Sequence, residues 1–344
     1  MTDYQKLKLN ASPAPHIRTK EDTTAIMVDV IIALLPALAF AVYNFGLRAL
    51  AVTLVSVVGC VIFEALYRLA ARRHQTVGDL SAVVTGMLLA FACPVTVPYW
   101  ALLIGDFFAI VIVKQLYGGI GKNLLNPALA GYALLSLWGE MMTVWAAPGS
   151  RAALWDAGEV LTCPTPMDYL HAGDLVGLQA AHSYTDVILG KISGSIGEIS
   201  ALCLLFGFLW LLFQRVILWT VPVSFVGTVA LLTFFFPQGH DPSAWMIYHL
   251  FSGSLLLGAI FMATDPVTSP VTRRGQILYG VGCGLLTVLI RYFGAHSEGV
   301  GYAILCMNLV VWLIDNSIRP RRFGVRRTAG LRKLFSGLKR KGGE

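Results

Sequence analysis

Charge is scarce in this sequence. Of 344 residues, only 13% are Asp, Glu, Lys or Arg, whereas 56% are hydrophobic and the mean hydropathy is +0.69. Soluble domains carry charge on about a quarter of their residues, so the composition excludes an ordinary soluble domain. Several apolar runs reach the roughly 20 residues that a helix needs to cross a bilayer. Because lipid offers no hydrogen bonds to the backbone, we expect an all-α polytopic membrane protein.

Metal and nucleotide motifs are also lacking. The six cysteines show no CxxC or other metal-ligand spacing, so no metal site or iron–sulfur centre is expected from this chain alone. No dinucleotide fingerprint is present, so no dinucleotide-binding site is expected in this chain. The polar segment before Ala25 is too long and mixed for a cleaved signal peptide. The net charge of +7 lies in basic flanks that suit anionic lipid headgroups, and we expect no nucleic acid partner.

The hydrophobic pattern predicts about ten transmembrane helices. The third is short and ends at Cys93-Pro94, which indicates a half-span or a broken helix. The expected spans are 25–45, 47–69, 79–93, 97–116, 126–145, 197–214, 216–236, 245–264, 275–293 and 299–317. The expected organisation is a tail (1–24), a five-helix unit (25–145), a long loop (146–196), a second five-helix unit (197–317) and a basic tail (318–344).

The basic residues of the short loops predict the orientation. They collect on one side, together with both tails, and the C-terminal tail alone has ten basic residues between Arg319 and Lys341. The opposite side includes 146–196, in which Arg151 and Lys191 are the only lysines and arginines. The positive-inside rule therefore predicts cytoplasmic termini and an external, periplasmic 146–196 loop. Arg291 does not fit this pattern, and we expect it to snorkel or to face a cavity.

The two halves contain similar segments. Residues 84–98 (VTGMLLAFACPVTVP) match 256–270 (LLGAIFMATDPVTSP) at an offset of 172, and 131–135 is echoed at 301–305. Five spans per half would place the halves in opposite orientations. The pattern therefore predicts two inverted five-helix repeats, an architecture shared with urea channels, with sites near interrupted helices. The simpler alternative is chance similarity between apolar helices.

Three groups of residues are candidate sites. In LTCPTPM (161–167), Thr162 and Thr165 beside prolines predict a rigid turn with exposed hydroxyls, although a solvated loop is the simpler interpretation. Asp106, in the middle of span four, is a candidate for an ion path, because ionisable residues are costly in a bilayer. For Glu64 and Asp29, an ion path and interfacial pairing with Arg68 or Lys20 are equally good interpretations. Small residues before span six could form a phosphate cradle at a helix start: Gly194, Ser195, Gly197 and Glu198.

Four blocks carry a resemblance to a known family. They are 114–135 (KQLYGGIGKNLLNPALAGYALL), 162–167 (TCPTPM), 190–200 (GKISGSIGEIS) and 263–270 (ATDPVTSP). They resemble the family that contains the D subunit of the RNF ion-translocating electron-transfer complex and the B subunit of the sodium-pumping NADH:quinone reductase. The similarity runs over nearly the whole chain. Without the long N-terminal extension of the quinone-reductase subunit, the RNF subunit is the expected match.

The resemblance implies a redox function. In that family FMN is joined by a phosphoester to the last threonine of an S/T-x-A-T motif, which corresponds to Thr165, with Thr162 as the fallback; Pro164 stands where alanine is usual. The Gly194–Glu198 segment would help to enclose the flavin. A second, inner site for an ion or a non-covalent flavin such as riboflavin would use the residues at two helix interruptions: Asn123, Asn126, Asp265 and Thr268.

The resemblance also implies partners. The expected function is electron transfer between ferredoxin and NAD coupled to Na+ or H+ transport, together with the other RNF subunits (A, B, C, E and G). The rival function is a urea-channel-like transporter of small solutes, and the B subunit of the quinone reductase is a further alternative. A bound flavin distinguishes the redox functions from the channel.

Overall fold

The computed structural model describes residues 22–151, 153–155, 162–294 and 297–318, so the predicted tails lie almost wholly outside the described residues. Within these ranges every regular element is a helix, and a single β-bridge joins Ala146 to Thr162. The first half contains α1 (Thr23–Phe45), α2 (Leu47–Ala70), α3 (Ser81–Ala92), α4 (Tyr99–Phe107), the π-helical η3 (Phe108–Gln115) and α5 (Pro127–Leu135). The second half contains α10 (Ala201–Phe213), α11 (Thr220–Phe235), α12 (Pro242–Phe251), α13 (Leu255–Leu257), the π-helical η4 (Gly258–Met262), α14 (Arg273–Phe293) and α15 (Val300–Ser317).

Four of these helices, α1, α2, α14 and α15, are long and apolar enough to cross a membrane. A fifth span is formed if α12 is joined with the Leu255–Met262 helix, although the two are bent by 59° relative to each other. Helices α3, α10 and α11 are apolar but shorter. The expectation of a helical membrane protein is therefore confirmed, with four or five spans identified by length and composition.

Two predicted spans differ from the observed helices. The span expected at 245–264 is broken around Gly253, whose φ of +74° is a left-handed conformation that glycine adopts without strain. The span expected at 126–145 ends at Leu135. There the Ser136 hydroxyl donates to Ala133 O at 2.8 Å, and the chain turns into the short α6 (Gly139–Met142). Both departures leave room for polar groups at the ends of helices.

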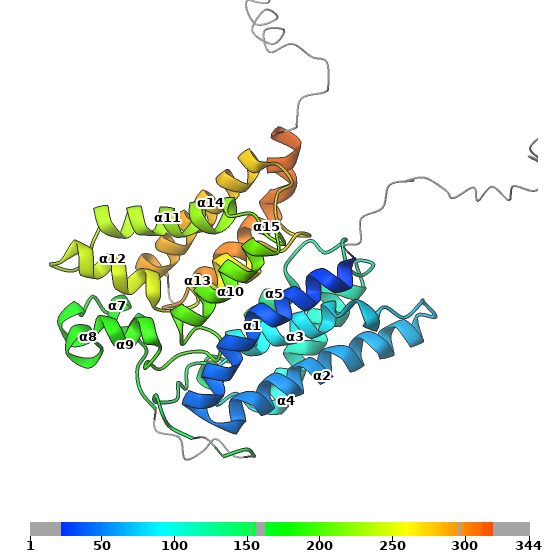
Figure 1. Cartoon of the computed structure of the whole chain (residues 1–344), viewed down its shortest axis with the longest axis horizontal. Coiled ribbons are helices and arrows are strands. Elements are labelled where there is room, and N and C mark those ends of the chain that lie inside the picture. The colour runs from blue at the N-terminus through cyan, green and yellow to red at the C-terminus, as the bar shows by residue number, and fades with distance from the viewer. Residues whose placement is uncertain (1–21, 152, 156–161, 295–296, 319–344) are drawn as a thin grey trace, which may run out of the picture.

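The helices form two groups, α1–α5 and α10–α15, as Figure 1 shows. In the first, α2 packs against α3 and α4; in the second, α11 packs against α14. The groups meet where α1 packs on α10 and α5 on α15. The 146–196 segment contains α7 (Pro166–His171), α8 (Leu175–Ala181) and α9 (Tyr184–Leu189), and α7 and α9 pack against α12.

Element order also follows the 172-residue offset of the sequence. Shifted by this number, α3 falls on 253–264, which includes α13 and η4, and α5 falls on 299–307, which overlaps the first half of α15. In the same way α1, α2 and α4 with η3 fall on α10, α11 and α14. The interfaces α1–α10 and α5–α15 thus join counterpart elements.

Candidate functional sites

Thr165 is the N-cap of α7. Its backbone N–H and its hydroxyl both donate to Asp168 Oδ2, at 2.9 and 2.8 Å, and Asp168 N–H is 3.3 Å from Thr165 Oγ1. This is a capping box, in which each residue satisfies a free backbone N–H group near the helix start. The sequence Thr-Pro-Met-Asp carries the signal for it, with Pro166 at the first helical position.

The capping box corrects one expectation. Thr162 is exposed, as predicted, but Thr165 is only 5% exposed because its hydroxyl turns toward Asp168. The Gly/Ser segment lies beside this turn: Ser193 Oγ donates to Pro164 O at 2.7 Å. The threonine turn at 162–165 and the Gly/Ser segment at 190–200 are therefore joined through Ser193, which the sequence analysis did not single out.

The 190–200 segment is fixed against the end of α3. Ile196 N–H donates to Cys93 O at 3.1 Å, and Gly197 N–H donates to Phe91 O at 2.9 Å. A Cβ on Gly197 would lie 2.5 Å from Phe91 Cβ, so no other residue fits without movement of the backbone.

Gly197→Ala should therefore destabilise the protein by about 1–3 kcal/mol, the usual cost of overpacking. Thermal unfolding of the purified protein in detergent measures this cost. The matched control is Gly227→Ala in α11, where a Cβ would meet nothing within 4 Å and where alanine favours the helix. Equal unfolding temperatures for the two variants would contradict the close fit.

A cavity of about 270 Å³ lies next to α7, and we call it the outer cavity after the side on which the charge pattern predicts it. Its walls combine aromatic rings with polar groups, including the carboxyls of Asp168 and Glu298, and the hydroxyls of Ser136 and Tyr302 are hydrogen-bonded to each other. Thr165 itself is not on the wall, but its hydroxyl donates a hydrogen bond to Asp168, which is on the wall. The lining residues are Tyr132, Ser136, Gly139, Met142, Thr143, Trp145, Asp168, His171, Ser297, Glu298 and Tyr302.

Near this cavity lie two buried charged side chains, Glu198 and Arg291, whose surroundings the sequence analysis only partly anticipated. Glu198 is 4% exposed, and its Oε1 accepts from Ser195 N–H at 2.9 Å. Arg291, expected to snorkel or to face a cavity, is 2% exposed and instead donates through Nη1 to His249 O at 2.8 Å. Burial against α12 therefore accounts for the basic residue that did not fit the charge pattern.

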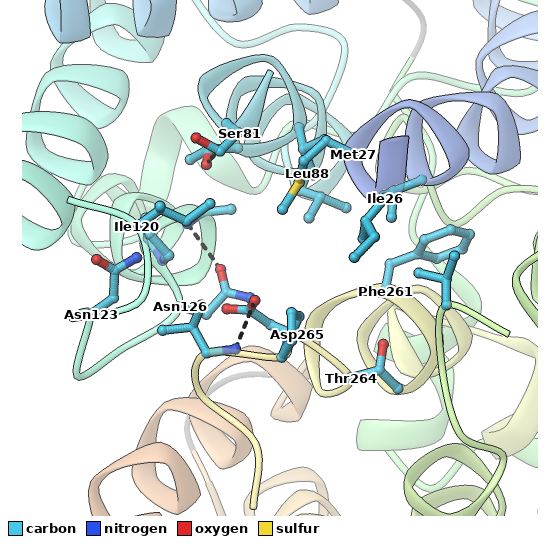
Figure 2. Close-up of a pocket in the computed structure, with 18 of the residues that line it drawn as sticks. Ile26, Met27, Ser81, Leu88, Ile120, Asn123, Asn126, Phe261, Thr264 and Asp265 are labelled. Atoms are coloured by element: carbon cyan, nitrogen blue, oxygen red, sulfur yellow. Dashed lines mark hydrogen bonds between the residues drawn. The ribbon is translucent and has the colours of Figure 1, made fainter. Parts of the chain in front are cut away.

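A second cavity, of about 130 Å³, lies at the N-terminal end of α5, whereas the outer cavity lies at its C-terminal end. We call this second cavity the inner cavity after its predicted side. Asn126 caps this helix through Ala128 N–H (3.1 Å), and its Nδ2 donates to Met262 O at 3.1 Å. Figure 2 shows Asn126 and Asp265 next to one another on the wall. Asn123 also lines the cavity, and its buried Oδ1 has no hydrogen-bond partner among the described residues. Thr268 is not on the wall but donates to Asp265 at 3.2 Å. The four predicted inner residues are thus gathered in one place.

One member of a buried ion pair that the sequence analysis missed also lines the inner cavity. Lys114, near the end of the predicted span 97–116, is 2% exposed and donates to Glu64 Oε2 at 2.7 Å and to Ser81 Oγ at 2.6 Å. Thr76 Oγ1 donates to the other Glu64 oxygen at 2.6 Å. Glu64 therefore pairs across helices with Lys114, whereas Arg68, its suggested partner, donates to Gln115 at 3.0 Å.

Asp106 lies apart from both cavities. It is fully buried where α4 passes into η3, and its Oδ1 accepts from Ser56 Oγ at 2.6 Å and from Cys60 Sγ at 3.3 Å. Its Oδ2 has no hydrogen-bond partner among the described residues. The side chain is on the wall of neither cavity, and the ion path at Asp106 stays a prediction.

The fold and its two cavities define a multi-pass helical membrane protein with polar sites at both ends of α5. Comparison with known families is specific: residues 10–324 match the NQR2, RnfD, RnfE family, and the chain belongs to that family.

Named relatives are similar over almost their full length. The D subunit of the Na+-translocating ferredoxin:NAD+ oxidoreductase complex of Acetobacterium woodii is 44% identical, covering 93% of this chain and 96% of the relative. The D subunit of the proton-translocating complex of Clostridium ljungdahlii is 39% identical, covering 92% and 96%. The D subunit of the ion-translocating oxidoreductase complex of Shewanella amazonensis is 38% identical, covering 91% and 97%.

Proposed function

We propose that this chain is the D subunit of an ion-translocating ferredoxin:NAD+ oxidoreductase, and that it carries FMN covalently on Thr165 and relays electrons coupled to Na+ or H+ transport. The other RNF subunits would be its partners in the bacterial inner membrane. Family membership and the names of the relatives support the subunit assignment. The attachment site rests on the Thr162-Cys163-Pro164-Thr165 motif.

One observation carries the flavin assignment: the Thr165 hydroxyl donates to Asp168, and Asp168 lines the outer cavity. The aromatic walls from Tyr132, Trp145 and Tyr302 suit a planar ring system. FMN, when attached, supplies one- and two-electron chemistry. The chain's own task is to orient it and to exclude side reactions.

An ester on Thr165 would require the capping box to open. The Thr165 hydroxyl donates a hydrogen bond to the Asp168 carboxylate, and a phosphate on the same oxygen would bring like charges together. Asp168 would then turn away, and its position on the cavity wall would give the carboxylate room to do so.

Flavin fluorescence tests this function. After expression with its flavin transferase and denaturation in SDS, the purified protein should give a fluorescent band under ultraviolet light. A dark band would exclude the covalent flavin and favour the channel alternative.

We also propose that the two helix groups are inverted five-helix repeats, with both termini cytoplasmic and 146–196 external. The repeated element order and the charge pattern support this topology. The inner cavity would then open toward the cytoplasmic side, where Asn123, Asn126 and Asp265 could hold an ion or a second, non-covalent flavin.

Cys163 provides a test of the topology, because it is exposed and adjoins the threonine motif. A membrane-impermeant maleimide should label it in spheroplasts and should not label it in sealed inverted vesicles. Cys163→Ser should remove the external label, because Cys60, Cys93 and Cys283 are buried and Cys203 and Cys306 lie within the apolar helices α10 and α15. Labelling that occurs only in inverted vesicles would reverse the proposed orientation.

A further inference from the structure

A buried carboxyl group and a half-buried one meet below the outer cavity. Glu198, just before α10, and Glu298, just before α15, are in side-chain hydrogen-bonding contact. Glu298 Oε2 accepts from Ser254 Oγ at 2.7 Å, and Glu198 Oε1 accepts from Ser195 N–H. Among the described residues no donor group reaches Glu198 Oε2, and the buried Ser195 Oγ is also unpartnered. The contact between the two acids therefore needs a proton of its own.

The charges around the pair lead to the same conclusion. Arg291 interacts electrostatically with both carboxyls. A Cβ on Gly253 would lie 2.9 Å from Glu298 Oε1 and 3.1 Å from Arg291 Nη2, and this nitrogen has no hydrogen-bond partner among the described residues. One guanidinium balances one carboxylate, so the second carboxyl must be neutralised in another way. The remaining titratable groups on the surrounding elements are His249 on α12, Tyr132 on α5, Asp168 and His171 on α7, and Tyr302 on α15.

Electrostatics favour a proton as the neutralising charge. Burial raises the pKa of Glu198 well above its ordinary value of 4.5, and the adjacent Glu298 carboxylate raises it further. Two carboxylates in contact repel each other, so a proton on one of them is favoured.

The pair has access to the outer cavity. Glu298 lines this cavity and also a much smaller one of about 10 Å³ between α5, η4 and α15. The smaller volume is about that of a single water molecule. Protons can therefore reach Glu298 from the outer side, while little solvent lies beyond it.

We propose that Glu198 and Glu298 form a proton-binding site at the base of the outer cavity, which holds one shared proton at neutral pH and exchanges it through that cavity. On release, the O–H bond of one carboxyl breaks, the proton passes to cavity water, and two carboxylates remain beside Arg291. The site depends on no cofactor, so it can be tested in flavin-free protein.

Infrared difference spectroscopy of the full-length protein in lipid nanodiscs tests the site. Raising the pH from neutral should remove a protonated-carboxyl C=O band, and Glu198→Gln should lack this band at every pH. Glutamine fits the site, because its carbonyl accepts from Ser195 N–H and its NH2 group can donate to Glu298. Asp106→Asn, which alters another buried carboxyl, should retain the band. A band that persists in Glu198→Gln and also in Glu298→Gln would overturn the proposal.

The pH dependence of unfolding gives a second measurement. Because the folded-state pKa of Glu198 lies above 4.5, folding binds a proton above that pH. This contribution to stability is complete below pH 4.5 and is lost as the pH rises through the folded-state pKa. Glu198→Gln should therefore lose less stability than the wild type over this interval. If Na+ at fixed pH removed the infrared band from the wild type, Na+ would compete with the proton for the pair, and a site selective for protons would be excluded.

Discussion

Thr165→Val is expected to abolish covalent flavin while leaving the fold intact. The substitution removes the only hydroxyl at the proposed attachment position, so in-gel fluorescence should fall to background. The hydroxyl also caps α7, and loss of such a cap costs about 1 kcal/mol. We therefore expect a small decrease in unfolding temperature with normal insertion into the membrane.

Thr162→Val is the matched control. Thr162 is three residues away in the same turn and is exposed, and no helix begins at it. Fluorescence should be retained in this variant. If fluorescence were retained in Thr165→Val and lost in Thr162→Val, the flavin would be attached to Thr162 instead. Collapse of both membrane insertion and unfolding temperature in Thr165→Val would indicate a structural role in place of the proposed one.

Lys114→Met should be among the most destabilising single substitutions in the protein. The variant leaves the Glu64 carboxylate buried, with only the hydroxyl of Thr76 to bind it. Breaking a buried ion pair by removing one partner costs about 3–5 kcal/mol. A large decrease in thermal unfolding temperature in detergent, or failure to accumulate in the membrane, is the expected result.

A paired substitution separates charge from packing. Glu64→Leu combined with Lys114→Met removes both charges, so most of the lost stability should return. Lys122→Met is the control for loss of a basic residue, because Lys122 is exposed in the loop that follows η3. A double variant as unstable as Lys114→Met alone would show that shape, and not the unpaired charge, causes the defect.

The helical membrane fold could be predicted from the sequence because it depends on local properties. Long apolar runs identified α1, α2, α14 and α15 to within two residues. The break around Gly253 was missed because the span as a whole is apolar, although Ser252-Gly253-Ser254 is a turn-forming sequence. A Cβ at Gly253 would lie close to Met167, Arg291 and Glu298, so the packing there favours glycine.

The candidate sites show the same division. Thr165 and Asn126 were found because they belong to short motifs. Lys114 and Glu64 are 50 residues apart and only their packing reveals that they are partners. Arg291 was noticed as a charge in the wrong place, but its contact with His249 O arises from the folding of α12 against α14. Polar groups paired across helices leave no periodic signal in one sequence.

Helix α5 has a consequence for electron transfer. Asn126, before its first residue, lines the inner cavity, and Ser136, just after its last, lines the outer one. At a rise of 1.5 Å per residue, its nine residues span roughly 14 Å. A redox group in each cavity would thus be kept at a fixed separation by one short helix, and α5 would serve as the spacer across which an electron tunnels. Its length, more than any movement of the chain, would set the rate.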